Sequence, residues 1–309
     1  MVSPARFGLT ARGLLSTRTT GSARITLGTA KWTSPAGQQC RWKGVATHRT
    51  AHGTDMNSQR SPAVEMQRKL GKGTNLAAEI TSMVLPGTFV LPPLSQFPKP
   101  FSQKVKLLWY WLLIKGQEIL TNAAVKYTSK PSFFKRAIYK PKRSVLIPTA
   151  KAMHRAMAEA LASGDRDTIN KICSRSLGTS LLASIDTRPK TRRYGWQLLD
   201  YTKKLFYPSV KSHRITALGR EKNAPIVRQA VVSISSRQRR VQYDAQGKVI
   251  PGSEKEIDVV EHVAMACVVD PRTWAESEWR LVGTISATTL EEWDAEKEIL
   301  KELMKNPSP

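Results

Sequence analysis

The sequence predicts an α+β fold in which helices come first and an antiparallel sheet follows. Across residues 146–161, apolar side chains recur at spacings of three and four, the period of one helix face: Leu146, Ala150, Met153, Met157 and Leu161. Between residues 226 and 269, apolar side chains instead alternate with polar ones, as in strands. A run of helices followed by a run of strands is typical of an α+β domain with a meandering sheet.

Local residues set the limits of the predicted helices. Gly164 predicts the end of the 146–161 helix, because glycine readily adopts the left-handed conformation of a helix C-cap. Asp165 can cap the helix that comes next. Ser176 precedes a third predicted helix.

Four strands are predicted after Arg188, over residues 210–218, 226–243, 256–269 and 279–285. In the second of these, apolar residues hold even positions first and odd positions later, which predicts a β-bulge. A hairpin loop is predicted at 244–248. Thr288 and Glu291 form a capping box that predicts a last, charged helix to about Lys305.

The region before the helices predicts a basic, proline-rich extension with one aromatic helix. Prolines between Pro86 and Pro100 fix φ and remove backbone donors, so this stretch predicts an extended strap along a surface. Residues 102–127 predict a helix around the apolar run 107–114. That run is far shorter than the roughly 20 apolar residues that span a bilayer.

The first 50 residues predict a mitochondrial transit peptide. No Asp or Glu precedes Asp55, and eight Lys and Arg lie among many Ser, Thr, Ala and Gly. The alternative is a basic tail that is retained. Removing residues 1–50 would leave 41 basic against 24 acidic residues, a net charge of +17, so the basic character is not confined to this segment.

The net charge of +25 predicts an anionic partner, such as RNA, DNA or acidic lipid. Basic clusters provide the candidate RNA-binding residues: Lys135, Arg136, Lys140, Lys142, Arg143, Arg188, Lys190, Arg192, Arg193, Lys203, Lys204, Arg237, Arg239 and Arg240. Arginine binds phosphate through two parallel hydrogen bonds, and the nearby Tyr194 and Trp196 can stack on exposed bases. No sequence-reading module is visible, which favours recognition of RNA shape and phosphates. The alternative for each cluster is a solvated face.

The predicted helix at 102–127 carries the candidate membrane-surface residues: Lys104, Lys106, Trp109, Trp111 and Lys115. Aromatic rings settle at the depth of lipid headgroups, and lysines extend their charge back to water. The alternative is a helix that packs in the core and exposes only its ends.

No catalytic, metal or cofactor site is predicted. The three cysteines are scattered without CxxC or zinc-site spacing, and no GxSxG, P-loop or dinucleotide-binding motif occurs. His262 shares a predicted strand face with Asp258, an arrangement that can hold a base but is more often an ordinary half-buried histidine. We therefore expect a protein that is not an enzyme.

Several runs of residues resemble a known family. The run Ala160–Asp165 followed by Leu181-Leu182 resembles the opening of the Tim44-like domain, and Tyr207–Arg214 resembles its entry into the sheet. With Leu85–Phe89 upstream, the chain is similar to the inner-membrane mitoribosome receptor and to the large-subunit mitochondrial ribosomal protein of that family. The resemblance covers roughly residues 85–290.

The resemblance implies a cystatin-like cone, with N-terminal helices packed on a curved antiparallel sheet. It also implies a matrix protein, peripheral on the inner membrane, that binds the mitochondrial large ribosomal subunit near its peptide exit and serves the membrane protein insertion machinery. One alternative is a peripheral subunit of the presequence translocase. Another is a small-molecule enzyme with a conical pocket.

These expectations divide the chain into four parts. Residues 1–50 are the transit peptide, and residues 51–145 are the basic extension. Residues 146–288 are the Tim44-like α+β domain, and residues 289–309 are the charged helix and tail.

Overall fold

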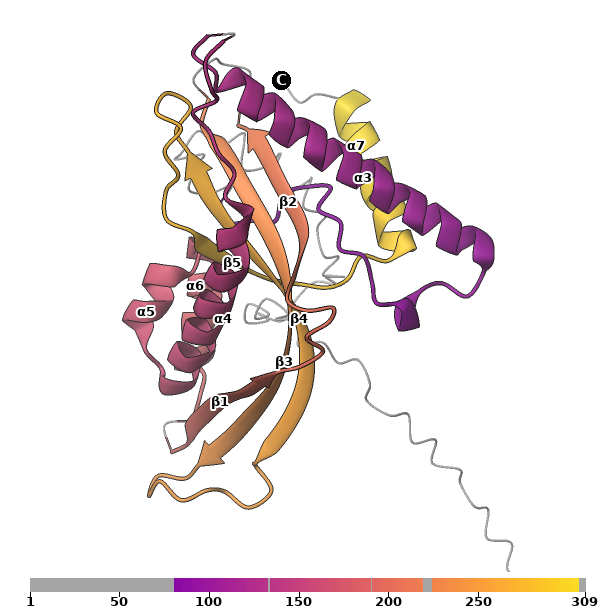
Figure 1. The fold of residues 1–309 in the computed structure, drawn as a ribbon. Helices are drawn as coiled ribbons and strands as arrows, with labels where there is room; N and C mark the ends of the chain where they lie inside the picture. The colour runs from indigo at the N-terminus through magenta and orange to yellow at the C-terminus, as the bar shows by residue number, and fades with distance from the viewer. Residues whose placement is uncertain (1–80, 133, 190, 219–223, 306–309) are drawn as a thin grey trace, which may run out of the picture. The chain divides into compact units, whose positions relative to one another are not determined.

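The computed structural model describes residues 81–132, 134–189, 191–218 and 224–305 (Figure 1). The predicted transit peptide and the start of the basic extension lie outside these ranges. The elements in chain order are η1 (Leu94–Gln96), α3 (Phe101–Thr128), η2 (Arg143–Val145), α4 (Leu146–Ser163), α5 (Arg166–Ile172), α6 (Arg175–Asp186), β1 (Arg193–Tyr201), β2 (Ser209–Ala217), β3 (Ile226–Tyr243), β4 (Lys255–Val269), β5 (Arg280–Ile285) and α7 (Leu290–Lys305).

The five strands form one antiparallel sheet in the order β1-β3-β4-β5, and β2 also pairs with β3. β1 pairs with the second half of β3 and β2 with its first half, so both lie along the same edge of that strand. β3 and β4 form the longest pairing, from Ile226–Val269 to Arg240–Lys255. The fold class predicted from sequence, α+β with an antiparallel sheet, is therefore confirmed.

Two details of the predicted sheet are wrong. β1 was not predicted, and the sheet has five strands in the described residues rather than four. The register between β3 and β4 shows no shift, so β3 has no bulge against β4; the register shifts lie at Leu198/Asp200 between β1 and β3, at Val210/Ser212 between β2 and β3, and at Ala264/Met265 between β4 and β5. Apolar residues occupy both parities of β3 because both of its faces are covered.

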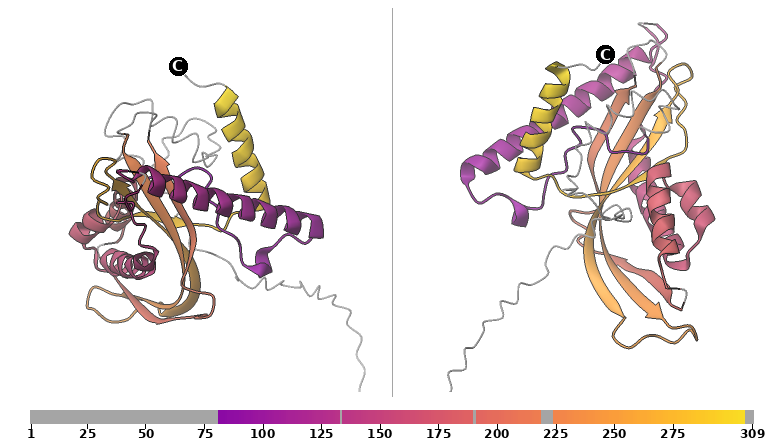
Figure 2. Two further views of the ribbon diagram at one scale, coloured as in Figure 1. Left: turned by 45° about the horizontal axis from the view of Figure 1, so that its top comes forward. Right: turned by 180° about the vertical axis from the view of Figure 1, so that it is seen from behind.

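Helices cover the two faces of the sheet. The α4–α6 group lies on one face and α3 with α7 on the other, with the sheet between them (Figures 1 and 2). Ala230, Val232 and Ile234 of β3 belong to the core cluster beneath α4–α6. Val227 and Val231 point the opposite way and pack with the strap residues 83–90.

Residues 83–90, which include the start of the predicted strap, lie over the sheet and are held by a few specific hydrogen bonds. The predicted extended course is interrupted by a turn at residues 86–87 and by η1. The Gln229 side chain of β3 accepts from the Leu85 amide and donates to the Met83 carbonyl, both at 3.0 Å. Val90 and Thr288 exchange two hydrogen bonds, of 3.0 and 2.8 Å. The strap thereby connects the sheet to the segment that leads into α7.

The helix limits follow the cap residues. Gly164 ends α4 with φ of 80°, and the Asp165 carboxylate accepts from the amides of Asp167 and Thr168 at 3.1 Å. α6 begins at Arg175 after Ser174, slightly earlier than the expected start after Ser176. The amide of Ser174 is already committed to the Leu281 carbonyl of β5, which fixes where this helix can start.

Candidate binding surfaces and cavity

The inner face of α3 docks through both apolar and polar contacts. Leu107 and Ile114 pack against Phe89 and Trp293. Further along the helix, the buried Glu118 carboxylate accepts from the Ser212 hydroxyl and from Lys115. Asn122 donates to the His213 carbonyl at 3.1 Å. One face of α3 is thus fixed against β2 and α7.

The outer face of α3 is apolar and uncovered. Its large exposed side chains are Phe101, Val105, Leu108, Trp109, Leu112, Leu113, Ile119, Leu120 and Tyr127. These positions fall on one side of the helix because they recur at helical spacing, opposite Leu107, Ile114 and Glu118. Within α3 the single carboxylate is Glu118, and it is buried, so the outer face carries no acid. A helix that is apolar on both sides normally has cover on both.

Lysines border this outer face. Lys104, Lys115 and Lys126 recur every eleven residues, about three helical turns, and therefore line one border. Lys106 lies on the other border and binds Asp294 of α7 at 2.7 Å. The ammonium of Lys115 is already used by Glu118 and by the Lys211 carbonyl.

The candidate membrane-surface residues therefore lie on different faces of α3. Trp109 is 58% exposed on the outer face, as expected. Trp111 turns inward and packs with the Phe89–Trp293 cluster, so its assignment to the membrane surface is corrected. Two residues along a helix differ by about 200°, so the two rings cannot share a face.

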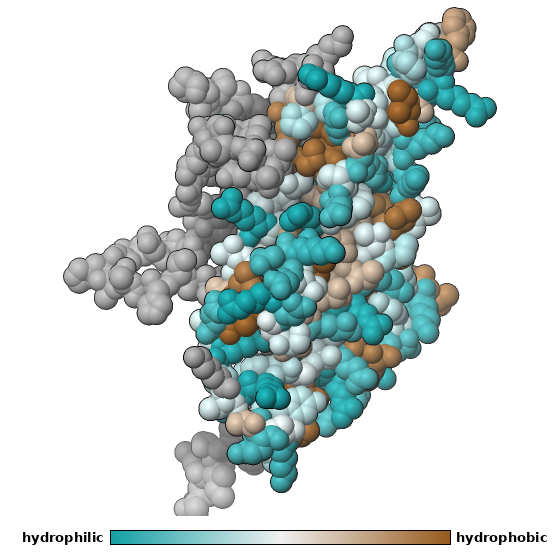
Figure 3. Space-filling model, turned by 90° about the vertical axis from the view of Figure 1, so that its left-hand side faces the viewer, coloured by the Kyte–Doolittle hydropathy of each residue, from teal (hydrophilic) through white to brown (hydrophobic). Residues whose placement is uncertain are grey.

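No described helix is long and apolar enough to cross a membrane. The side of the molecule that carries α4–α6 shows mainly hydrophilic atoms with scattered apolar spots (Figure 3). The continuous apolar stripe described above belongs to α3.

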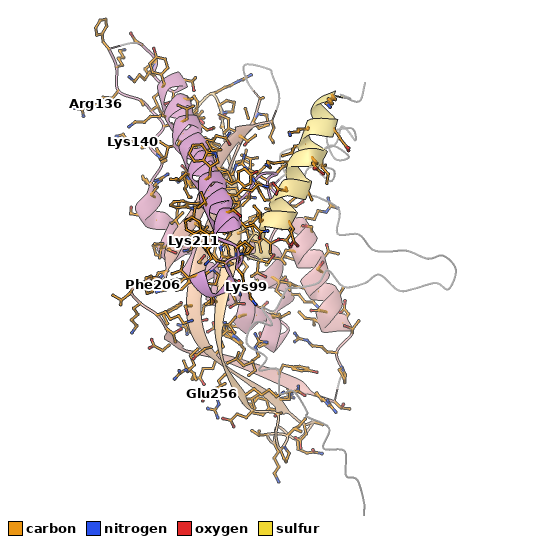
Figure 4. The ribbon with its side chains drawn as sticks, turned by 90° about the vertical axis from the view of Figure 1, so that its right-hand side faces the viewer. Lys99, Arg136, Lys140, Phe206, Lys211 and Glu256 are labelled. Atoms are coloured by element: carbon orange, nitrogen blue, oxygen red, sulfur yellow. The ribbon has the colours of Figure 1, made fainter. Side chains whose placement is uncertain are left out.

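The candidate RNA-binding residues of the loop between α3 and α4 are all exposed: Lys135, Arg136, Lys140, Lys142 and Arg143. None of them forms a salt bridge within the part of the chain that the structure describes. Arg136 and Lys140 lie beyond one end of α3 and point away from the body of the molecule (Figure 4). Their charges remain available to an anionic partner.

The cluster at 188–193 is less uniform than its sequence suggests. Arg188 donates to the Leu161 carbonyl of α4 at 2.6 Å and lies 4.8 Å from the Tyr194 ring centroid. Burial lowers the pKa of Arg188, which holds α4 to β1 rather than projecting into solvent. Arg192 and Arg193 are exposed, and Lys190 lies outside the described residues.

The cluster on β3 is largely paired with acids. Arg237 binds the Asp258 carboxylate through two hydrogen bonds, of 2.9 and 3.1 Å, and Arg239 pairs with Glu254. Arg240 is half-buried and donates to Gln238. Arg237 is exposed, whereas Arg239 is half-buried. The acidic partners are Asp258 of β4 and Glu254, which comes just before that strand. Lys203 and Lys204 are exposed, and Lys204 lies 3.6 Å from Asp200.

A cavity of about 910 Å³ lies between α4 and the end of the sheet formed by β1, β3 and β4. At its lining, the Glu261 carboxylate bonds to His154 at 2.8 Å and accepts from Gln238 at 2.6 Å. Gln238 in turn accepts from the Trp196 indole at 2.9 Å. Burial raises the pKa of Glu261, but the hydrogen bond and charge of His154, with further help from Gln238 and Arg240, outweigh it and leave the pKa below its ordinary value.

Sequence reasoning missed this pair and singled out a different one. His262 does not meet Asp258: it bonds to Ser233, while Asp258 binds Arg237. Burial lowers the pKa of His262 to about 4, so this histidine is neutral and structural. His154 and Glu261 lie 107 positions apart, and neither belongs to a motif that could have signalled the contact. Among the described residues no group of His, Cys, Asp and Glu could hold a metal ion.

Comparison with known proteins gives one family match. Residues 144–286 match the sequence model of the Tim44-like domain, which confirms the resemblance to that family over this part of the chain. No curated protein matches the chain. The crystal structure of the intermembrane space region of chloroplast protein ARC6 aligns with 46% of this chain and 97% of that chain, at 14% identity and a TM-score of 0.28.

Proposed function

We propose that this chain, whose residues 144–286 form a Tim44-like domain, is a peripheral protein of the matrix face of the mitochondrial inner membrane that holds the large ribosomal subunit there. The observation that carries the membrane part is the uncovered apolar face of α3 with its border of lysines. The Tim44-like domain itself fits peripheral association with the inner membrane.

The dimensions and charge of α3 suit a helix lying flat in the interface. Its 28 residues extend about 42 Å at 1.5 Å per residue. Fully burying each Leu, Ile or Phe side chain contributes about 1.5–3 kcal/mol, and each lysine near an anionic leaflet adds about 1 kcal/mol. The outer face of α3 carries no acid, so none of its own side chains is repelled by anionic headgroups.

Two double variants of α3 test this docking. Leu112→Glu with Ile119→Glu places two charges on the outer face, and Gln103→Glu with Gln117→Glu places the same two charges on exposed positions outside it. We expect the first pair to abolish co-flotation with vesicles that contain phosphatidylglycerol and the second to weaken it only slightly. Equal loss in both would show that net charge, rather than the apolar face, governs binding.

The ribosomal part of the proposal rests on the candidate basic residues of the loop between α3 and α4, which form no salt bridge among the described residues. Charges without acidic partners can neutralise RNA phosphates at no cost in broken ion pairs. Sedimentation of mitochondrial extract across a salt series tests this part: the protein should migrate with the large subunit at low salt and leave it as salt rises. Migration with a protein translocase, independent of ribosomes and salt, would favour the presequence-translocase alternative.

The proposed role requires no catalysis. The Glu261 carboxylate at the cavity is engaged by His154 and Gln238, and His262 is engaged by Ser233, so the described contacts of both groups are structural. Glu261→Gln should therefore leave vesicle and ribosome binding unchanged.

A further inference from the structure

The connection between β1 and β2 exposes two large apolar side chains side by side. Leu205 is 94% exposed and Phe206 is 73% exposed, and both follow Lys203 and Lys204. We call residues 203–206 the apolar tip. Two adjacent bulky apolar side chains with this exposure are shielded from water only when a partner covers them.

The backbone of the apolar tip forms a tight turn. Lys203 has φ of 51°, and its carbonyl accepts from the amides of Phe206 and Tyr207 at 3.0 and 3.1 Å. Just before the tip, Thr202 is fixed to Ser235 of β3 through its amide and its hydroxyl. These amides therefore need no water, which lowers the cost of placing the tip in a medium poor in hydrogen-bonding partners.

Tyr207, which follows the apolar tip, is linked to α3 through Lys211. Lys211 provides the connection, because its carbonyl accepts from Lys115 of α3 and its ammonium lies 5.4 Å from the Tyr207 ring centroid. Phe206, Lys140 and Arg136 point to the same flank of the molecule, the flank along which α3 runs (Figure 4).

The charge around the tip is positive. The tip itself contains Lys203 and Lys204, and Lys211 lies over the ring of the adjoining Tyr207. Asp258 is already paired with Arg237. Asp200 lies at 3.6 Å from Lys204, which at this exposure is a weak ion pair. Exposed apolar side chains flanked by lysines are the pattern of a segment that inserts into an anionic lipid surface.

We propose that the apolar tip is a second insertion point on the same anionic lipid surface that α3 contacts. This inference rests on the proposed docking of α3. A helix lying on a plane makes a line contact and leaves the molecule free to roll about that line. A contact off the line removes this freedom, so the tip fixes which way the sheet, the cavity and the basic loops face.

Lipid is the occupant favoured over RNA. Leu205 is the more exposed of the two apolar residues of the tip, and an aliphatic side chain neither stacks on a base nor binds phosphate. In an acyl environment the same side chain is removed from water, and the two lysines can extend to the headgroups.

An environment-sensitive fluorophore on a single cysteine tests both contacts at once. Cys173 and Cys267 are buried, so labelling of the full chain with Cys40→Ser can be directed to an added cysteine. Three positions are compared: Phe206→Cys at the tip, Ile119→Cys on the outer face of α3, and Glu159→Cys on α4 as the control. On phosphatidylglycerol vesicles containing brominated lipid, we expect quenching at positions 206 and 119 and none at 159.

The outcomes separate the two claims. Quenching at 119 without quenching at 206 overturns the tip and leaves the docking of α3 intact. No quenching at either position overturns both. A spectral change at 206 on adding ribosomes without vesicles would assign the tip to a ribosomal partner and overturn the lipid proposal.

A second variant measures how much the tip contributes. Leu205→Ser with Phe206→Ser should weaken vesicle affinity by about tenfold or more, with the thermal unfolding curve unchanged because both side chains are exposed. Unchanged affinity would show that the tip does not enter the bilayer.

Discussion

Single buried side chains hold α3 and the sheet together, and His213 lies at the centre of them. Its ring accepts from Arg228 at 2.8 Å, and its carbonyl accepts from Asn122 of α3. Arg228, 1% exposed, also binds Glu276 and lies 5.1 Å from the Trp279 ring centroid. A ring that accepts from a guanidinium must be neutral, so this network exists only while His213 is deprotonated.

This requirement predicts a pH dependence of stability. Burial, followed by the charges of Arg228, Arg143 and Lys115, lowers the pKa of His213 from 6.5 to about 3. Between these values the unfolded chain binds a proton that the folded chain does not, so stability is complete above pH 6.5 and declines as pH falls toward 3. The decline is about 1.4 kcal/mol per pH unit for one histidine.

Urea denaturation at a series of pH values from neutral to mildly acidic measures this decline. His213→Gln keeps an acceptor for Arg228 but cannot titrate. The slope of its free energy of unfolding against pH should therefore be smaller than that of the wild type by the contribution of one proton. His262→Asn is the matching variant at a second buried histidine, whose pKa is also lowered, to about 4. Identical slopes in the wild type and the His213 variant would mean that this histidine is protonated in the folded state.

Among the secondary-structure elements, α3 differs from the others in having two apolar faces. α4, α5 and α6 each bury one stripe and expose the other side to water. α3 buries Leu107 and Ile114 and leaves the larger apolar face open. Its two tryptophans report on the two faces separately.

Replacing each tryptophan by alanine should therefore have opposite consequences. Trp109→Ala removes an exposed ring, so vesicle affinity should drop several-fold while the melting temperature stays within about a degree or two. Trp111→Ala removes a ring packed in the α3–α7 cluster, so it should destabilise the fold by about 2–4 kcal/mol. Flotation assays and calorimetry on both proteins check this; a loss of stability in Trp109→Ala would place that ring in the core.

Elements in which apolar residues recur at a regular spacing could be predicted from the sequence, and elements shaped by tertiary contacts could not. The spacing in 146–161 predicted α4 nearly to the residue, because that helix buries one stripe. β1 escaped prediction because it is an edge strand with a register shift at Leu198/Asp200, which breaks the alternation of buried side chains. The apolar run 107–114 concealed which side of α3 faces the sheet, since both sides are apolar.

Net charge and clustering pointed to the basic loop at 135–143, whose candidate residues form no salt bridge with any residue that the structure describes. That this loop binds RNA stays a prediction. Net charge and clustering could not reveal that Arg237 and Asp258, 21 positions apart, meet across β3 and β4, because that contact depends on strand register. For the same reason the cavity pair of His154 and Glu261 was not found.

Across the whole molecule, some basic clusters are paired with acids and others have no acidic partner among the described residues. Their contributions to the salt dependence of binding should therefore differ. Replacing Lys135, Arg136, Lys140, Lys142 and Arg143 by Gln should weaken ribosome binding and lower the salt slope by about 0.7–0.9 for each phosphate that is no longer neutralised. Replacing Arg237, Arg239 and Arg240 by Gln should have a smaller effect, because two of these arginines already bind carboxylates. Co-sedimentation at several salt concentrations measures both slopes; a larger change from the β3 variant would locate the RNA-binding surface on the sheet.

The position of the strap and α3 in the chain has a consequence for how the fold is reached. The amide of Leu85 bonds to a side chain 144 positions further on, and Glu118 bonds to one 94 positions on, whereas β3 and β4 pair across a short hairpin. Long-range contacts form only after the later segments exist, and synthesis proceeds from the N-terminus. Any process that delivers the chain N-terminus first therefore presents α3 with both apolar faces bare until β2 and β3 arrive. In that interval the face of α3 that carries Leu107 and Ile114 is as exposed as the outer face, and it becomes buried only when the later segments pack against it.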